Sequence, residues 1–311
     1  MSIDLSELAA RVVRPDDDAR DAARSRLAEM YPSGAFGRLG ELAEWLAGVQ
    51  GHCPTRPIGQ VRFIAVAGSS EPPGPGSSAG SMQLSQLLAV SPVTSRLVED
   101  GRTDCQGRED IEQAFETGLA VADEEVDNGA DLLVAADVDA GSAIAAATAV
   151  AVITGSDVAK VTGRGTGIDD REWMRRCAAV RDGARVARRV LADGADVLDL
   201  LSTLGSAPLA VLTGLITQAA VRQTPVVLNG LGTTAAALVA HRLSPRTARW
   251  IVAGHASPDP GQAAALDKLR LRPLIDYAIA LEDGTGALLA VPHVQAAARL
   301  LTADDSSPFA G

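Results

Sequence analysis

Four short apolar segments, each followed by a polar or glycine-rich turn and then by a helix, constrain the fold of this chain most. They lie at residues 62–68, 131–136, 224–228 and 250–253. Strands that alternate with helices pair in parallel, because each helix carries the chain back across the sheet before the next strand begins. The pattern therefore predicts an α/β fold with a parallel, Rossmann-like sheet flanked by helices.

The two ends of the chain do not follow this alternation. Residues 1–58 are charged and have helical periodicity, and a stretch with two prolines separates them from the first strand. The last apolar helix follows the final glycine motif and runs to about residue 301. We expect a smaller helical lobe built from these N-terminal and C-terminal segments, with domains at 1–58, 59–288 and 289–311.

Composition excludes several classes of function. The chain is 47% hydrophobic but only 3% aromatic, so its core must consist mainly of Ala, Leu and Val. A net charge of −11 argues against a nucleic-acid partner, since binding to a phosphate backbone is driven by basic residues. No apolar run approaches the ~20 residues that a membrane span needs. The N-terminus resembles no signal peptide, and three scattered cysteines form no metal or disulfide pattern, so we expect a cytoplasmic protein.

Polar residues follow the predicted strands where each strand ends. Parallel sheets bind ligands at the carboxyl ends of their strands, so convergence of these side chains predicts a small-molecule site. Each also has a plainer explanation: the aspartate could cap the alanine-rich helix that follows it, the asparagine could form a turn, and the histidine could bond loop backbone. The residues are Ser69, Ser70, Asp137, Asn229 and His255.

A glycine-rich segment with the sequence GRGTG lies at 163–167, before a predicted amphipathic helix at 171–192. Asp169 or Asp170 would cap that helix. Free amides and the positive dipole end of a helix N-terminus suit a phosphate or carboxylate. The segment could equally be an ordinary turn between a strand and a helix.

Taken in order, the motifs of the chain resemble those of the nicotinate-nucleotide–dimethylbenzimidazole phosphoribosyltransferase family. The resemblance runs from about residue 32 to residue 301, with a shortened and dissimilar part near 69–108. The matching segments are GRLGEL at 37–42, ADEE at 122–125, GRGTG at 163–167 with Asp169 and Asp170, PVVLNG at 225–230, GHASPDPG at 254–261 and LEDGTG at 281–286.

The resemblance implies a homodimeric enzyme with a phosphoribosyl-binding α/β domain and a smaller helical one. Such an enzyme moves the phosphoribosyl group of nicotinate mononucleotide onto a nitrogen of 5,6-dimethylbenzimidazole or a related base, which activates the lower ligand of cobalamin. Its partners are small molecules, and it requires no metal or cofactor.

The same resemblance assigns roles to residues of this chain. Asp283 stands where the family has the glutamate that takes the benzimidazole proton, and Asp137 stands where it has a second catalytic acid. A carboxylate in a dry pocket suits such a role, because burial raises its pKa towards working pH. The residues expected on the phosphate and ribose side are Gly163, Gly165, Thr166, Gly167, Gly205 and Ser206, and those on the base side are Ser69, Ser70, Asn229 and His255.

Departures from the family motifs concentrate on the side of the acceptor base. The segment at 137–144 lacks one glycine, an asparagine and two threonines of the family pattern, Asn229 replaces an aspartate, and Asp283 is one methylene shorter than the glutamate. Two hypotheses follow. The chain is a phosphoribosyltransferase, or it is a catalytically degenerate paralogue that binds a nucleotide or serves as a regulatory or structural subunit.

Overall fold

The computed structural model describes residues 3–32, 34–68, 82–99, 107–139, 141–165 and 168–302. The chain divides into two compact units. The larger comprises Met1–Val13 and Gln60–Leu289, and the smaller comprises Arg14–Gly59 and Ala290–Gly311.

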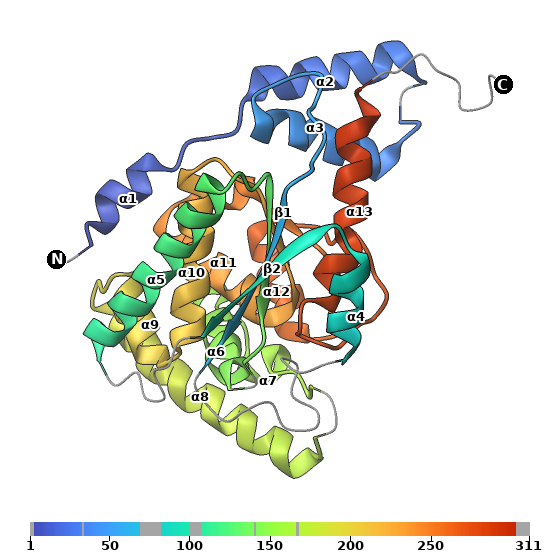
Figure 1. Ribbon diagram of the computed structural model, residues 1–311. Helices are drawn as coiled ribbons and strands as arrows, with labels where there is room; N and C mark the ends of the chain where they lie inside the picture. The colour runs from blue at the N-terminus through green and yellow to red at the C-terminus, as the bar shows by residue number, and fades with distance from the viewer. Residues whose placement is uncertain are drawn as a thin grey trace. The chain divides into compact units, whose positions relative to one another are not determined.

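The larger unit is built on a parallel sheet of five strands, which confirms the predicted fold class (Figure 1). The order across the sheet is β2-β1-β3-β4-β5. Strands β3 and β4 are wholly buried, as their apolar sequences require. The strands are β1 (Val61–Ala67), β2 (Val93–Glu99), β3 (Leu132–Asp137), β4 (Val226–Leu228) and β5 (Ile251–Ala253).

Helices connect these strands and continue at both ends of the chain. Their bounds are α1 Leu5–Arg11, α2 Asp17–Met30, α3 Gly37–Gln50, α4 Met82–Val90, α5 Arg108–Asp127, α6 Ser142–Thr154, α7 Val158–Val161, α8 Asp170–Ala192, α9 Val197–Leu204, α10 Ala207–Val221, α11 Gly230–Leu243, α12 Pro260–Leu269 and α13 Thr285–Leu300, with a 3₁₀ helix at Pro245–Trp250.

Helices α5 and α10 pack side by side at unusually close range (Figure 1). A Cβ atom added at Gly118 of α5 would overlap the backbone of α10, and one added at Gly214 of α10 would overlap the backbone of α5. The two glycines thus let the helix backbones touch. Helix α10 also contacts β1 and β3, and α11 contacts β3, so both anchor the strands that end at the candidate site.

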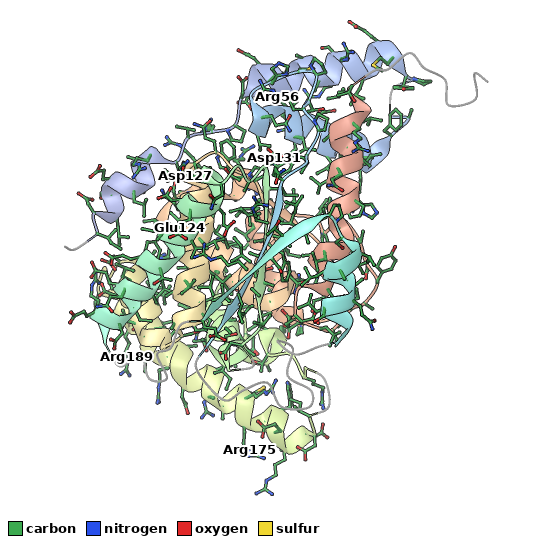
Figure 2. All side chains as sticks on the ribbon, in the orientation of Figure 1. Arg56, Glu124, Asp127, Asp131, Arg175 and Arg189 are labelled. Atoms are coloured by element: carbon green, nitrogen blue, oxygen red, sulfur yellow. The ribbon has the colours of Figure 1, made fainter. Side chains whose placement is uncertain are left out.

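Helix α8 has the amphipathic character that its sequence predicts. Val180, Ala184 and Ala187 are buried on one face. Arg175 and Arg189 are exposed and extend away from the helix (Figure 2). The helix therefore covers the core with small apolar side chains while Arg175 and Arg189 remain in solvent.

The smaller unit combines α2 and α3 with the second half of α13. Thr55 donates a hydrogen bond from Oγ1 to the carbonyl of Ala298 at 2.6 Å, and Arg26 donates from Nε to the carbonyl of Leu301 at 3.1 Å. These bonds join segments more than 240 residues apart in the sequence. Helix α1 instead belongs to the larger unit, where the indole of Trp250 donates to the carbonyl of Val13 at 2.9 Å.

Candidate active site

Three of the predicted site residues lie at the carboxyl ends of neighbouring strands. Asp137 is the last residue of β3, Asn229 follows β4, and His255 lies two residues beyond β5. These strands are adjacent and parallel in the sheet, so the three residues occupy one edge. Asp137 is 3% exposed, and Asn229 and His255 are fully buried. The edge thus brings together polar groups that lie far apart in the sequence.

Asp137 is enclosed by the start of α6 and by α11. Its Oδ1 accepts from the backbone N–H of Asp139 at 3.1 Å, and its Oδ2 accepts from the hydroxyl of Ser142. A Cβ atom at Gly232 in the first turn of α11 would overlap the carboxylate. Burial raises the pKa of Asp137 to about 7, although the bond from Ser142 opposes the shift. Asp137 therefore orders the turn into α6 and also presents a carboxyl group that can exchange a proton near neutral pH.

Asn229 and His255 connect the strand ends to α13. The Oδ1 atom of Asn229 accepts from the backbone N–H of Ala287 at 3.0 Å. Its Nδ2 atom is buried and has no hydrogen-bond partner among the described residues. The ring of His255 lies against Gly286, where a Cβ atom would overlap it, and burial lowers the pKa of this histidine. Both residues pack the beginning of α13 against the edge of the sheet.

The two acidic residues that precede α13 have different environments. Asp283 is fully buried, and its Oδ1 accepts from the backbone N–H of Thr285 at 3.0 Å. Glu282 is only partly buried. Its Oε2 accepts from the N–H of Leu231 at 2.7 Å, and its Oε1 accepts from the hydroxyl of Ser257 at 3.3 Å. The carboxyl group of Glu282 thus joins the first turn of α11 to the loop after β5.

Glu282 belongs to a cluster of three carboxyl groups that the sequence motifs did not indicate. Burial, together with the charges of Asp259 and Asp137, raises the pKa of Glu282 to about 8 against the opposing effect of its bond from Leu231. Burial also raises the pKa of Asp259. We refer to Asp137, Asp259 and Glu282 as the carboxyl cluster. The only sequence signal for Glu282 was its position beside Asp283.

The glycine-rich segment lies against this cluster. A Cβ atom at Gly163 would overlap the carboxylate of Asp259, so a side chain at this position would displace that carboxylate. Gly165 has φ +62°, in the left-handed region that favours glycine, and the guanidinium of Arg176 on α8 lies beside it. The charge of Arg176 also acts on Asp259, where it lowers the pKa against the effect of burial. A cation and two glycines therefore adjoin the carboxyl cluster.

The N-terminus of α8 is less open to an anion than the sequence suggested. Asp169 caps it by accepting from the N–H of Glu172 at 2.8 Å. Asp170 in the first turn forms an ion pair with Arg164, whose guanidinium stacks 4.8 Å from the ring centroid of Trp173. The free amides expected at this helix end are therefore partly occupied, and three acidic side chains add negative charge. An anion would have to rely on the glycine segment and Arg176 instead.

Gly205 and Ser206 lie at helix ends, and each has a structural role there. Gly205 ends α9 with φ +64°, and the hydroxyl of Ser206 caps α10 by accepting from the N–H of Leu209 at 3.3 Å. The other predicted site residues lie outside the described part of the chain. They are Ser69, Ser70, Thr166 and Gly167.

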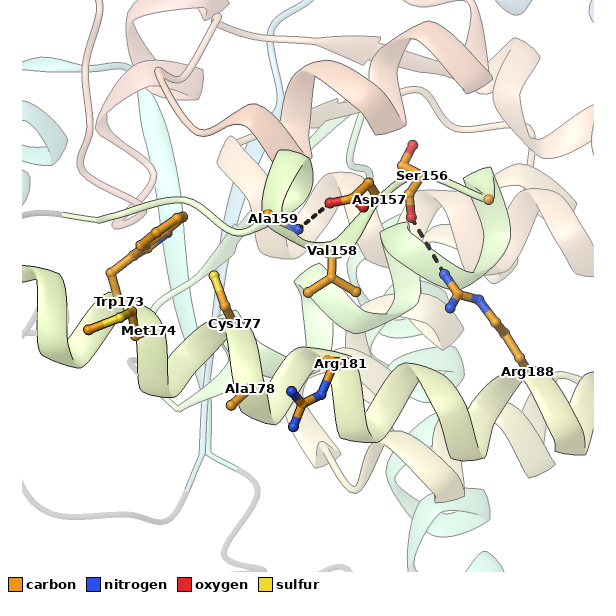
Figure 3. A pocket seen from close by; sticks show the side chains of 11 residues that line it. Ser156, Asp157, Val158, Ala159, Trp173, Met174, Cys177, Ala178, Arg181 and Arg188 are labelled. Atoms are coloured by element: carbon orange, nitrogen blue, oxygen red, sulfur yellow. Dashed lines mark hydrogen bonds between the residues drawn. The ribbon is translucent and has the colours of Figure 1, made fainter.

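A separate cavity of about 830 Å³ opens between the turn after α6 and α8 (Figure 3). Trp173, Cys177 and Arg181 line one side of it, and the other side is the segment around Ser156 and Asp157. One wall of the cavity is a turn with a structural role, since Asp157 in that turn caps α7 by accepting from the N–H of Ala159 at 2.9 Å. Its lining is distinct from the carboxyl cluster.

The described residues contain no helix that combines the length and the apolar character needed to cross a membrane. Within the same part of the chain, no group of three or more His, Cys, Asp or Glu residues is arranged to hold a metal ion.

Known proteins resemble this chain over nearly its whole length. A family model described as phosphoribosyltransferase matches residues 12–71 and 102–308. The protein named nicotinate-nucleotide–dimethylbenzimidazole phosphoribosyltransferase is 40% identical in Streptomyces avermitilis, over 96% of this chain and 90% of that one. Its Streptomyces coelicolor counterpart is 41% identical, over 96% of this chain and 95% of that one.

Solved structures agree with these relatives. The crystal structure of CobT from Thermus thermophilus superimposes with a TM-score of 0.81 and 28% identity, covering 92% of this chain and 96% of that one. A structure of the nicotinate-nucleotide–dimethylbenzimidazole phosphoribosyltransferase from that organism gives a TM-score of 0.80 at 27% identity, covering 93% and 97%. The strand order, the polar edge of the sheet and these relatives lead to one conclusion: the chain belongs to the nicotinate-nucleotide–dimethylbenzimidazole phosphoribosyltransferase family.

Proposed function

We propose that this protein transfers the phosphoribosyl group of nicotinate mononucleotide to 5,6-dimethylbenzimidazole or a related base. The products are nicotinate and the α-ribazole phosphate that activates the lower ligand of cobalamin. The observation that carries the proposal is the carboxyl cluster, which lies beside the glycine segment and Arg176 in a chain of this family. The relatives at 40–41% identity support the substrates.

The carboxyl cluster suits the charge that this reaction develops. The ribose carbon C1′ of nicotinate mononucleotide is bonded to a positively charged pyridinium nitrogen. As that bond breaks, the electron pair stays with nicotinate and positive charge spreads over C1′ and the ring oxygen. Fixed negative groups in a site that excludes water stabilise such a charge strongly. Asp137, Asp259 and Glu282 would provide them once the positive charge of the bound pyridinium has lowered their pKa values.

We assign the phosphate to the glycine segment that lies against Asp259 of the cluster. Backbone N–H groups of Gly163 and Gly165 can approach an anion closely because neither residue has a side chain. Arg176 supplies a positive charge beside Gly165 in a chain whose net charge is −11. An anion held by Arg176 and the glycines, with C1′ towards the carboxyl cluster, gives the substrate one orientation.

The hypothesis of a degenerate paralogue receives no support. The Streptomyces relatives carry the name of the enzyme, and this chain covers 90% and 95% of their length. Replacement of the family's aspartate by Asn229 has a local explanation, because the side chain of Asn229 anchors α13 through Ala287.

Three further features remain proposals. We propose that the protein is a homodimer in the cytoplasm, as the resemblance implies. We also propose that residues 59–288 form the catalytic domain, preceded by the helical segments at 1–58, of which α1 belongs to the larger unit, and followed by a C-terminal helix and tail at 289–311. Light scattering coupled to size-exclusion chromatography tests the dimer: a mass near twice the 31.9 kDa of the chain supports it, and the mass of a single chain contradicts it.

Product analysis tests the proposed function. The protein is incubated with nicotinate mononucleotide and a panel of benzimidazoles, and the mixture is separated by liquid chromatography and analysed by mass spectrometry. We expect a ribosylated, phosphorylated product whose mass follows that of the benzimidazole supplied. The variant Asp137→Asn should form it at least about a hundredfold more slowly, a loss typical of removing one preorganised electrostatic group. Absence of every such product with the wild-type protein would refute the proposal.

A further inference from the structure

Glu282 and Asp283 are neighbours in the sequence, but only one of them is placed to meet a substrate. Asp283 is fully buried, whereas Glu282 retains part of its surface in contact with solvent. A group that takes a proton directly from a ligand must come within hydrogen-bond distance of that ligand. The greater exposure of Glu282 therefore favours it over Asp283 as the residue that takes a proton from the ligand, although the family motif indicates Asp283.

The contacts of Asp283 account for its burial and its position without a role in proton transfer. Its Oδ1 atom accepts from the N–H of Thr285, which fixes the turn that opens α13. Its negative charge also acts on the buried ring of His255 and raises the pKa of that histidine against the effect of burial. Asp283 thus holds the beginning of α13 against the loop after β5.

The contacts of Glu282 suit a group that changes its charge. The N–H of Leu231 donates to Oε2 and the hydroxyl of Ser257 donates to Oε1, so each oxygen has one donor when the carboxylate is ionised. Two acidic groups face it, Asp259 from the loop after β5 and Asp137 from β3, and both oppose the ionised form. The charge of Arg176 on α8 acts on Asp259 and so offsets part of this negative charge.

We propose that Glu282, rather than Asp283, accepts the proton that the benzimidazole loses during the reaction. This assignment rests on the proposed function. One benzimidazole nitrogen forms a bond to C1′ while the bond from C1′ to the pyridinium nitrogen breaks, and the electron pair of that bond stays on nicotinate. The proton on the second benzimidazole nitrogen passes to the carboxylate of Glu282, which later releases it to solvent.

The positively charged substrate would prepare Glu282 for this step. A carboxyl group with a pKa of about 8 is mostly protonated at neutral pH. A pyridinium bound near it favours the ionised form, since an opposite charge at short range lowers the pKa of an acid. Binding of nicotinate mononucleotide alone should therefore release up to about one proton from Glu282 and leave a carboxylate ready to act as a base.

Two isosteric variants separate the roles of the neighbours. Glu282→Gln should lower kcat by about a hundredfold or more, as expected for loss of a general base, with a change in KM for nicotinate mononucleotide below about threefold. Asp283→Asn should retain kcat within about tenfold but unfold at a lower temperature. The exposed Glu29→Gln is a matched control that should change neither quantity. Glu282→Asp, which keeps a carboxylate, should restore part of the rate together with its pH dependence.

Calorimetry supplies a readout that requires no turnover. The heat of binding of nicotinate mononucleotide is measured near neutral pH in two buffers of different ionisation enthalpy, which gives the number of protons released. We expect wild-type protein and Asp283→Asn to release similar numbers of protons and Glu282→Gln to release fewer, by up to about one per site, with Asp137 titrating in all three proteins.

The possible results distinguish the two proposals. A folded Glu282→Gln that keeps wild-type kcat, or a loss confined to Asp283→Asn, overturns the assignment and leaves the proposed function intact. Wild-type protein that binds nicotinate mononucleotide with proton release but forms no product refutes the proposed function instead. Binding without proton release also overturns the assignment.

Discussion

Raising the pH from about 5 to about 8.5 should destabilise the folded protein, and Glu282 should account for much of the loss. The pKa of Glu282 is raised from 4.5 to about 8 in the folded state. Below pH 4.5 the group is protonated whether the chain is folded or not. Between pH 4.5 and 8 the unfolded chain gives up this proton while the folded protein keeps it, so stability falls as the pH rises.

The size of the expected loss in unfolding free energy follows from the pKa shift of Glu282. One pKa unit corresponds to ~1.4 kcal/mol, so the interval from about pH 5 to about pH 8 gives an upper bound of ~4 kcal/mol. Glu282 is partly exposed, and local relaxation and water reduce the cost of its charge. We therefore expect about half of that bound, ~2 kcal/mol, to depend on Glu282.

Urea unfolding followed by circular dichroism measures this contribution. The free energy of unfolding is extrapolated linearly at both pH values for wild type, Glu282→Gln and the control Glu29→Gln. Glutamine is neutral at every pH, so its variant should lose ~2 kcal/mol less than wild type between about pH 5 and about pH 8.5. Asp137, with a pKa of about 7, contributes its own loss over this interval in wild type and in the variant. Parallel losses in all three proteins would refute the argument that partial burial and the neighbouring charges raise the pKa of Glu282.

Three other predictions test contacts of the fold and the site. Gly214→Ala should lower the free energy of unfolding by ~1–3 kcal/mol, because its Cβ overlaps α5, whereas the unobstructed Gly107→Ala should change it little in the same urea assay. Gly232→Ala should displace the carboxylate of Asp137 and reduce kcat by about a hundredfold while the protein stays folded by circular dichroism; unchanged kcat would contradict that contact. Arg176→Gln should raise KM for nicotinate mononucleotide by about tenfold or more with a smaller effect on kcat, and unchanged KM in steady-state assays would exclude Arg176 from phosphate binding.

The sequence predicted which polar residues lie at the carboxyl ends of the strands, because simple rules govern where a strand ends. A buried parallel strand is a short apolar run, and the residue that ends it can be read directly. Asp137 and Asn229 were found in this way. Strand β2 was missed because it lies at the edge of the sheet and is partly exposed along much of its length, so it lacks a continuous apolar run.

The carboxyl cluster could not be predicted in the same manner. Asp259 and Glu282 come from loops, and their meeting with Asp137 depends on the path of the chain after β5 and before α13. Motif comparison led to Asp283, since it matches by position, but burial distinguishes it from Glu282 only in three dimensions. A cap on α8 by Asp169 or Asp170 was predicted, and Asp169 provides it, yet its consequence for anion binding emerged only with the neighbouring charges of Asp170 and Glu172.

The rate of nicotinate release tests the central claim most directly, because breaking the bond between C1′ and the pyridinium nitrogen is the step that the carboxyl cluster would assist. Wild-type protein is mixed with nicotinate mononucleotide, and free nicotinate is followed over time with and without 5,6-dimethylbenzimidazole. We predict release that requires the benzimidazole and that equals the amount of ribosylated product formed. Release no faster than in the absence of protein, with any benzimidazole tested, would contradict the claim.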